Sequence, residues 1–148
     1  MNKPLSIPES KVPALSAETL DRVRQFENAL EKCPQVEINV ESVLFAGIYA
    51  RTIKIPAGVV ITGALLQVPT VLQISGRCIL NLGEQAAEIN GYAVFKADVG
   101  RKQVIYALTD TFVTASFATT AQSVEEAENE ATAEAEKLTT RRTNKWVT

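Results

Sequence analysis

The polar residues best suited to bind a small ligand lie in the middle of the chain, among residues that favour β-strands. Arginine presents a planar fork of N–H donors that fits a carboxylate or a phosphate, and glutamine and tyrosine add neutral hydrogen bonds. Side chains of these types could hold an anionic or planar molecule where strands converge at the mouth of a barrel. The candidate ligand-binding residues are Arg51, Gln73, Arg77, Arg101, Gln103 and Tyr106.

Catalytic chemistry has much weaker support, because the 148 residues include no histidine. Histidine is the commonest general acid and base near neutral pH and a usual metal ligand, so its absence removes most triad-type and metal-dependent enzymes. A serine nucleophile would need a Ser75–Lys102 pair, and nothing in the sequence places these two residues together. The acidic residues that could act in pairs all lie beside predicted turns, where a solvated side chain is the default; they are Glu84, Glu88, Asp98 and Asp110. We therefore predict no catalytic residues, no metal and no cofactor.

Composition limits the class of protein. A chain of 148 residues with 46% hydrophobic residues can form one cored domain with terminal segments. The net charge of −2 gives no overall reason to bind nucleic acid or an anionic membrane. The first residues lack a signal-peptide pattern, which predicts a protein that is not exported. Cys33 and Cys78 are expected to be separate reduced thiols.

The N-terminal part is predicted to be an extended arm followed by a helix. Prolines disfavour a helix over residues 1–15, because proline lacks the donor N–H and restricts the residue before it. Ser16 is a suitable N-cap for a helix from about Ala17 to Lys32, and Pro34 ends this segment of residues 16–34. The helix carries a narrow apolar stripe for packing on the barrel or on a partner subunit, and its candidate interface residues are Leu20, Val23 and Leu30.

Residues 35–120 change to short runs of β-branched and aromatic residues between turn formers, which predicts an antiparallel sandwich or barrel. Pro56-Ala57-Gly58 is a predicted turn, and Asn90-Gly91 is the sequence of a tight hairpin. The predicted strands are Val36–Val40, Ile48–Ile55, Val59–Leu66, Val71–Ile74, Arg77–Leu82, Ala86–Ile89, Tyr92–Lys96, Gln103–Leu108 and Phe112–Phe117.

Residues 121–148 are predicted to form a second helix, Ser123–Leu138, and a tail. Ser123 and Glu126 fit a capping box. Small residues recur at helical spacing and could pack on this chain's own barrel or on a symmetry mate. The candidate interface residues are Ala127, Ala131, Ala135 and Leu138, with Trp146, the one tryptophan, as a docking anchor in the tail.

Several motifs resemble the small cupin-like proteins encoded by tailed bacteriophages, over about residues 36–138. They are Gly47–Arg51, Ile55–Gly58, Thr62–Gly63, Gly100–Gln103 and Tyr106–Thr111. The resemblance implies an antiparallel cupin-type jelly roll, or β-barrel, with flanking helices. It also implies a barrel mouth that can hold a metal or a small ligand, in a homo-oligomer.

The metal-binding pattern of cupins is not met. The positions that align with cupin histidines hold Pro69, Val71 and Gln103, and neighbouring positions hold Leu66, Thr70 and Leu108. None of these side chains replaces an imidazole.

Two functions follow as hypotheses. The first is a non-enzymatic, oligomeric structural protein of a phage, located in the host cytoplasm or the virion, with other virion proteins as possible partners and no membrane or strong nucleic-acid signal. The alternative is a metal-free cupin pocket that binds or sequesters a small anionic ligand, such as a metabolite or a nucleotide signal.

Overall fold

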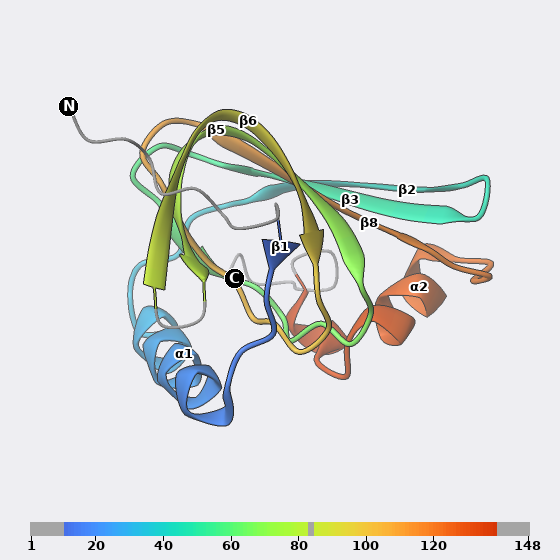
Figure 1. Cartoon of the computed structure of the whole chain (residues 1–148), viewed down its shortest axis with the longest axis horizontal. Helices are drawn as coiled ribbons and strands as arrows, with labels where there is room; N and C mark the ends of the chain where they lie inside the picture. Colours follow the sequence, from blue (N-terminus) through green and yellow to red (C-terminus); the bar gives the residue numbers. More distant parts are fainter. Residues whose placement is uncertain (1–10, 83–84, 139–148) are drawn as a thin grey trace.

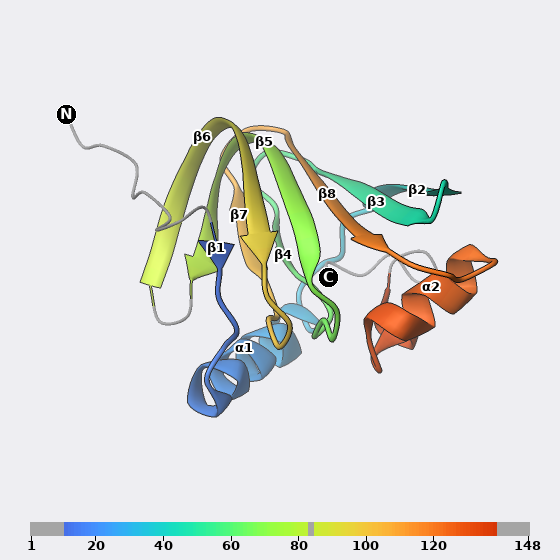
Figure 2. The same cartoon turned by 45° about the vertical axis from the view of Figure 1, so that its right-hand side comes forward.

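A bent ribbon of two long strands organises the fold (Figure 1). The computed structural model describes residues 11–82 and 85–138. Strands β5 (Thr70–Leu82) and β6 (Gln85–Ala97) pair antiparallel along their whole length. Figure 2 shows the ribbon arching over the molecule, so that its two halves belong to two facing layers.

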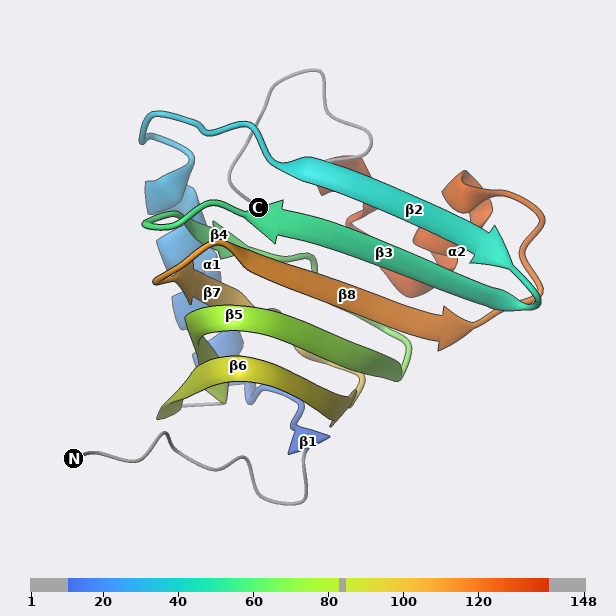
Figure 3. The same cartoon turned by 90° about the horizontal axis from the view of Figure 1, so that it is seen from above.

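The first layer is a broad sheet, seen from above in Figure 3. Next to β5 lie, in order, β8 (Thr111–Ala118), β3 (Ile48–Ile55) and β2 (Asn39–Phe45), all antiparallel to their neighbours. The short strand β1 (Lys11–Val12) pairs in parallel with the outer edge of β6. The sheet therefore ends at β1 on one side and at β2 on the other.

The second layer is smaller and uses the other half of the ribbon. Strand β7 (Val104–Ala107) pairs with β4 (Val60–Thr62) on one side and with Cys78–Leu80 of β5 on the other. Buried isoleucine, leucine, valine and phenylalanine side chains from both layers form one apolar cluster between them. The fold is the predicted mainly β, antiparallel jelly roll with flanking helices, and β1 supplies its one parallel pairing among the described residues.

Helix α1 (Ala17–Leu30) begins as predicted at Ser16, whose side chain accepts a hydrogen bond from Thr19 N at 3.1 Å. The helix ends at Leu30, two residues earlier than predicted, and it lies below β4 and β7 in Figure 2. Val23 of the predicted interface stripe is buried within the chain, and Leu20 and Leu30 are half-buried.

The second predicted helix is shorter than expected. Helix α2 (Val124–Ala131) has the predicted cap, since Ser123 Oγ accepts from Glu126 N at 3.1 Å. The helix stops at Thr132, whose backbone is extended and whose Oγ1 donates to Leu65 O at 2.5 Å. Thr132 Oγ1 also accepts from Glu134 N at 3.1 Å, and a side chain that bonds to its own nearby backbone competes with helix continuation. Only a short 3-10 turn, η2 (Ala135–Lys137), follows.

The small-residue stripe of α2 packs on this chain's own sheet, the first of the two predicted alternatives. Ala127 and Ala131 are buried against Tyr49 and Phe117, and Ala135 is buried as well. The small side chains let the helix approach these rings, which lie 5.4 Å apart between centroids. This surface is therefore used within the monomer. Leu138 lines the interior cavity described below, and Trp146 lies outside the described residues.

The strand boundaries depart from prediction in several places. Predicted strands Val71–Ile74 and Arg77–Leu82 are one strand, β5, and Ala86–Ile89 and Tyr92–Lys96 are likewise one strand, β6. The strand predicted at Val36–Val40 begins later, as β2, and the one predicted at Val59–Leu66 shortens to β4. The turn at Pro56-Ala57-Gly58 is confirmed, with Gly58 at φ +84°.

The hairpin predicted at Asn90-Gly91 is wrong. Both residues lie inside β6, where Gly91 faces Gly76 and Asn90 faces Arg77 of β5. Gly76 and Gly91 have φ angles of +134° and +102°, which glycine adopts readily and other residues rarely do. The paired glycines therefore lie within the arch of the ribbon, where other residues would be strained.

Replacing Gly76 with alanine is expected to destabilise the fold more than replacing Gly91 does. A Cβ on Gly76 would lie 2.7 Å from Asp110 O and 2.9 Å from Thr111 Cα, whereas one on Gly91 would meet no atom within 4 Å. Both variants carry backbone strain of about 1–3 kcal/mol. The difference between their free energies of unfolding therefore measures the steric clash alone. Urea midpoints of G76A and G91A measure it, and equal midpoints would contradict the close packing of β5 on Thr111.

Candidate functional site

The candidate site is a cavity of about 110 Å³ between the two layers, with one wall formed by α2 and the residues after it. Its lining is mainly apolar, which favours a ligand with a hydrocarbon body. The apolar lining includes Ile53, Ile61, Leu66, Leu72, Ile105, Val113 and Phe117. The polar side chains that reach it include Tyr49, Arg51, Arg101, Gln103 and Glu128.

Arg101 is the most unusual residue of the lining, because its side chain is buried and only partly paired. The residue is 1% exposed, and its Nη2 donates to Thr70 Oγ1 at 2.6 Å. Its Nε and Nη1 are buried and have no acceptor among the described residues. Burial lowers the pKa of Arg101 from 12.5 to about 10, against an opposing attraction from Asp98. The guanidinium is therefore still charged at neutral pH, at a cost to the folded state.

Gln103 presents a buried acceptor whose orientation is fixed by its neighbours. Its Nε2 donates to Asn81 O at 3.1 Å and to Asn81 Oδ1 at 2.8 Å. The Asn81 amide is oriented in turn, because its Nδ2 donates to Lys102 O and its Oδ1 accepts from Val104 N. Gln103 Oε1 is then left buried without a hydrogen-bond donor among the described residues.

A second polar cluster approaches the cavity from β3 and α2. Tyr49 Oη donates to Glu128 Oε2 at 3.2 Å and lies 3.3 Å from Ser42 Oγ. Burial raises the pKa of Tyr49 and lowers the pKa of Arg51. For Arg51 the attraction of Tyr49 and Glu128 opposes the effect of burial. The carboxylate of Glu128 therefore balances the positive charge of Arg51 on this side of the cavity.

The structure brings together half of the predicted ligand residues. Arg51, Arg101 and Gln103 line the cavity. The other three predicted residues do not line this cavity, since strand alternation turns them away from it. Gln73 donates to Tyr92 Oη at 3.3 Å on the outer face, Arg77 pairs with Glu88 at 2.9 Å, and Tyr106 is exposed.

The sequence interpretation missed Tyr49 and Glu128. Tyr49 could have been found from alternation, because Tyr49, Arg51, Ile53 and Ile55 occupy every second position of one strand and so share a face. Glu128 gave no comparable signal, since nothing local distinguishes it from the other glutamates of its helix.

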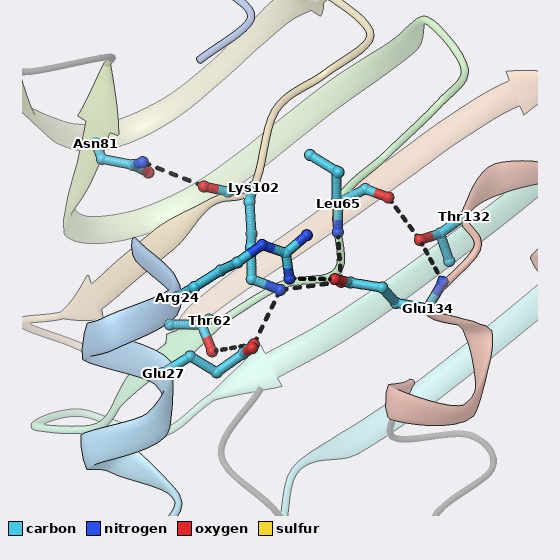
Figure 4. Close-up of polar contacts among 8 residues, drawn as sticks. All are labelled: Arg24, Glu27, Thr62, Leu65, Asn81, Lys102, Thr132 and Glu134. Atoms are coloured by element: carbon cyan, nitrogen blue, oxygen red, sulfur yellow. Dashed lines mark hydrogen bonds and ion pairs between the residues drawn. The ribbon is translucent and has the colours of Figure 1, made fainter. Parts of the chain in front are cut away.

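A buried ion-pair network joins α1, the segments at Leu65 and Lys102, and the residues after α2 (Figure 4). Lys102 is 0% exposed, and its Nζ lies 2.9 Å from Glu27 Oε2 on α1 and 3.0 Å from Glu134 Oε2 after α2. Glu134 also accepts from Arg24 at 2.6 Å and from Leu65 N at 3.0 Å. Lys102 is thus committed to two carboxylates, and the Ser75–Lys102 pair considered above does not form, as Ser75 is exposed.

The residues present do not fit the metal that the cupin resemblance implies. Proline and valine offer no side-chain donor at positions 69 and 71, and Val71 is exposed. Gln103 reaches the cavity but directs its nitrogen to Asn81. Within residues 11–82 and 85–138, no group of three or more His, Cys, Asp or Glu side chains could hold a metal ion.

Both cysteines are free thiols. Cys33 is exposed and Cys78 is buried, and neither forms a disulfide. In the described part of the chain, no helix has the length and apolar character to span a membrane.

No protein-family model and no curated protein sequence matches the chain. Solved structures of similar fold include an ectoine synthase from P. lautus, which covers 74% of this chain and 83% of its own, at 14% identity and a TM-score of 0.47. A cupin superfamily protein from Desulfitobacterium hafniense covers 60% of this chain and 83% of its own, at 8% identity and a TM-score of 0.47.

A salicylate 1,2-dioxygenase from Pseudaminobacter salicylatoxidans covers 71% of this chain at 13% identity and a TM-score of 0.49. This chain spans about a third of that enzyme, since the match covers 35% of its length. All three similarities concern the fold, and the structures of similar fold include enzymes.

The Glu134 network predicts acid sensitivity. Burial raises the pKa of Glu134, but hydrogen bonds from Leu65 N, Arg24 and Lys102 outweigh it and set the pKa to about 2, below the ordinary 4.5. The ionised carboxylate therefore stabilises the fold above about pH 5, and this contribution is lost as the pH falls towards 2. We expect Glu134→Gln to have lower stability at pH 7 and a flatter loss of stability between about pH 5 and 2 than the wild type.

Denaturant midpoints across this pH range measure both effects. Glu136→Gln removes the same charge from an exposed residue of η2 and is the matched control, with stability at pH 7 expected near that of the wild type. Parallel curves for the wild type and Glu134→Gln would contradict the role of the Glu134 ion pairs.

Proposed function

We propose that this protein binds a small anionic ligand in the cavity between its layers, without a metal. The observation that carries the proposal is the buried Arg101 guanidinium, which has two nitrogens without an acceptor in the described chain and borders an apolar cavity. Buried charges in folded proteins are normally paired, because desolvation of a lone ion is costly. An anion in the cavity supplies the missing partner.

The proposed activity is binding rather than catalysis. The polar groups around the cavity hold charge and donate hydrogen bonds, and Glu128 is engaged by Tyr49 and attracted to Arg51. An arginine that remains protonated at neutral pH is a good anion anchor and a poor general acid or base. We accordingly assign Arg101 the role of counter-charge and the apolar lining the role of a shape-selective wall.

The proposal predicts that Arg101→Met folds at least as stably as the unliganded wild type. A residue of similar length without charge removes an unpaired buried ion, and such replacements are often neutral or stabilising by about 1–4 kcal/mol. The same variant should lose the rise in melting temperature that small monoanions, such as acetate and isovalerate at millimolar concentration, give the wild type. Thermal unfolding with and without each anion measures both quantities.

Arg77→Met is the matched control, because it removes an exposed arginine paired with Glu88. It should keep the anion-dependent rise. If Arg101→Met loses several kcal/mol of stability, or if it responds to the anions as the wild type does, Arg101 is a structural residue and the proposal fails.

A second candidate function is assembly into an oligomer. In its more specific form, the protein is encoded by a phage and acts in the virion or in the host cytoplasm. Its support is the resemblance to cupin-like phage proteins and an exposed apolar patch at the tip of the β2–β3 hairpin. Val43, Phe45 and Ile48 form this patch and are 57%, 77% and 48% exposed. Apolar groups gathered at a sheet edge favour a partner, here a second copy of the chain.

This candidate predicts that Phe45→Lys converts an oligomer to monomers without unfolding it. Lys54→Ala, on the same strand pair but away from the tip, should leave the oligomer intact. Light scattering gives the molar mass, and circular dichroism verifies folding. A wild type that is monomeric at high micromolar concentration excludes the assembly function and leaves the binding function unaffected.

A further inference from the structure

We infer that the ligand of the cavity is a compact organic monocarboxylate with a hydroxyl group on a branched or cyclic hydrocarbon body. This inference rests on the proposed function and specifies its ligand class. Three observations carry it, namely the surplus charge of the lining, the unpaired buried atoms of two lining residues and the volume of the cavity.

The surplus charge of the lining is one positive charge. Arg51, Arg101 and Glu128 are its ionisable side chains of fixed charge, and Glu128 balances Arg51. Asp98, which also attracts Arg101, is already paired with Lys11 at 3.0 Å. A monoanion neutralises the remaining charge, whereas a phosphate dianion or a zwitterion leaves an uncompensated buried charge.

The unpaired atoms of two lining residues, Arg101 and Gln103, call for one anionic acceptor and one donor. Arg101 Nε and Nη1 are donors without an acceptor, and a carboxylate fits guanidinium N–H groups. Gln103 Oε1 is an acceptor without a donor, in an amide whose orientation is fixed through Asn81. An ammonium group could donate to Oε1 but would add a second positive charge, so a hydroxyl group is the donor that satisfies both conditions.

The volume of the cavity limits the body of the ligand. A cavity of about 150 Å³ is known to hold a benzene ring, and this cavity measures about 110 Å³. A nucleotide is therefore far too large, and a branched side chain of four or five carbons is a better fit. The isoleucine, leucine and valine side chains of the lining would cover that hydrocarbon.

Titration calorimetry with four matched probes tests this ligand class. 2-Hydroxyisovalerate is expected to bind most tightly, and isovalerate, which lacks the hydroxyl group, about tenfold more weakly because Gln103 Oε1 stays unpaired. The neutral isovaleramide and the zwitterion valine should bind at least about tenfold more weakly than isovalerate, because neither neutralises Arg101 with a net negative charge. Inorganic phosphate should not bind.

Two variants assign the contacts. Arg101→Met should abolish binding of both acids, whereas Gln103→Met should still bind both and lose the tenfold preference for the hydroxy acid. If both acids bind the wild type equally, or if phosphate binds better than either, the ligand class is wrong while anion binding in the cavity stands. If no anion binds, the ligand class and the proposed function both fail.

Discussion

The bend of the β5–β6 ribbon is the constraint on which the rest of the structure depends. An antiparallel ribbon can serve two facing layers only if both of its strands change direction at the same place. Here that place has glycine opposite glycine, Gly76 and Gly91. Beyond the bend, the ribbon supplies the partner for β7 in the smaller layer, while its other half continues the broad sheet. The space between the layers, and the cavity in it, follow from this geometry.

Two consecutive buried cations, Arg101 and Lys102, differ in how completely their charges are paired. Lys102 has two carboxylates within 3.0 Å and lies at the junction of α1 with the segment after α2. Arg101, one residue earlier, has a hydroxyl partner and two nitrogens without an acceptor in the described chain. Successive residues of an extended chain point to opposite sides, so one cation serves the junction and the other faces the cavity. The fully paired cation holds the junction together, and the incompletely paired one is the observation from which we propose a ligand.

Much of this arrangement could be predicted from local pattern. Alternation from Arg101 into β7 places Arg101, Gln103 and Ile105 in the cavity lining. The same rule applied to Leu72, Ile74, Cys78 and Leu80 of β5 would have turned Gln73 and Arg77 outwards. The predictions that failed at Asn90-Gly91 and at the end of α2 concern residues whose contacts lie far away in the sequence. Asn90-Gly91 has the local chemistry of a hairpin, and only its pairing with Arg77 and Gly76 makes it a strand interior. The early end of α2 likewise depends on the bond from Thr132 to Leu65, which no helical periodicity reveals.

The missing imidazoles and the buried arginine are connected through the same electrostatic requirement. An anionic ligand in an apolar cavity needs a positive charge nearby, and either a bound metal or a protonated side chain can supply one. A metal needs several donors in a fixed geometry, which Pro69 and Val71 cannot provide at the positions aligned with the cupin histidines. An arginine carries its positive charge without other side chains to coordinate it, but its burial costs free energy of folding. The lowering of the Arg101 pKa to about 10 by burial reflects this cost. The next residue, Lys102, forms ion pairs with Glu27 on α1 and with Glu134 after α2, and so fixes the segment that carries Arg101 to both of these parts of the chain.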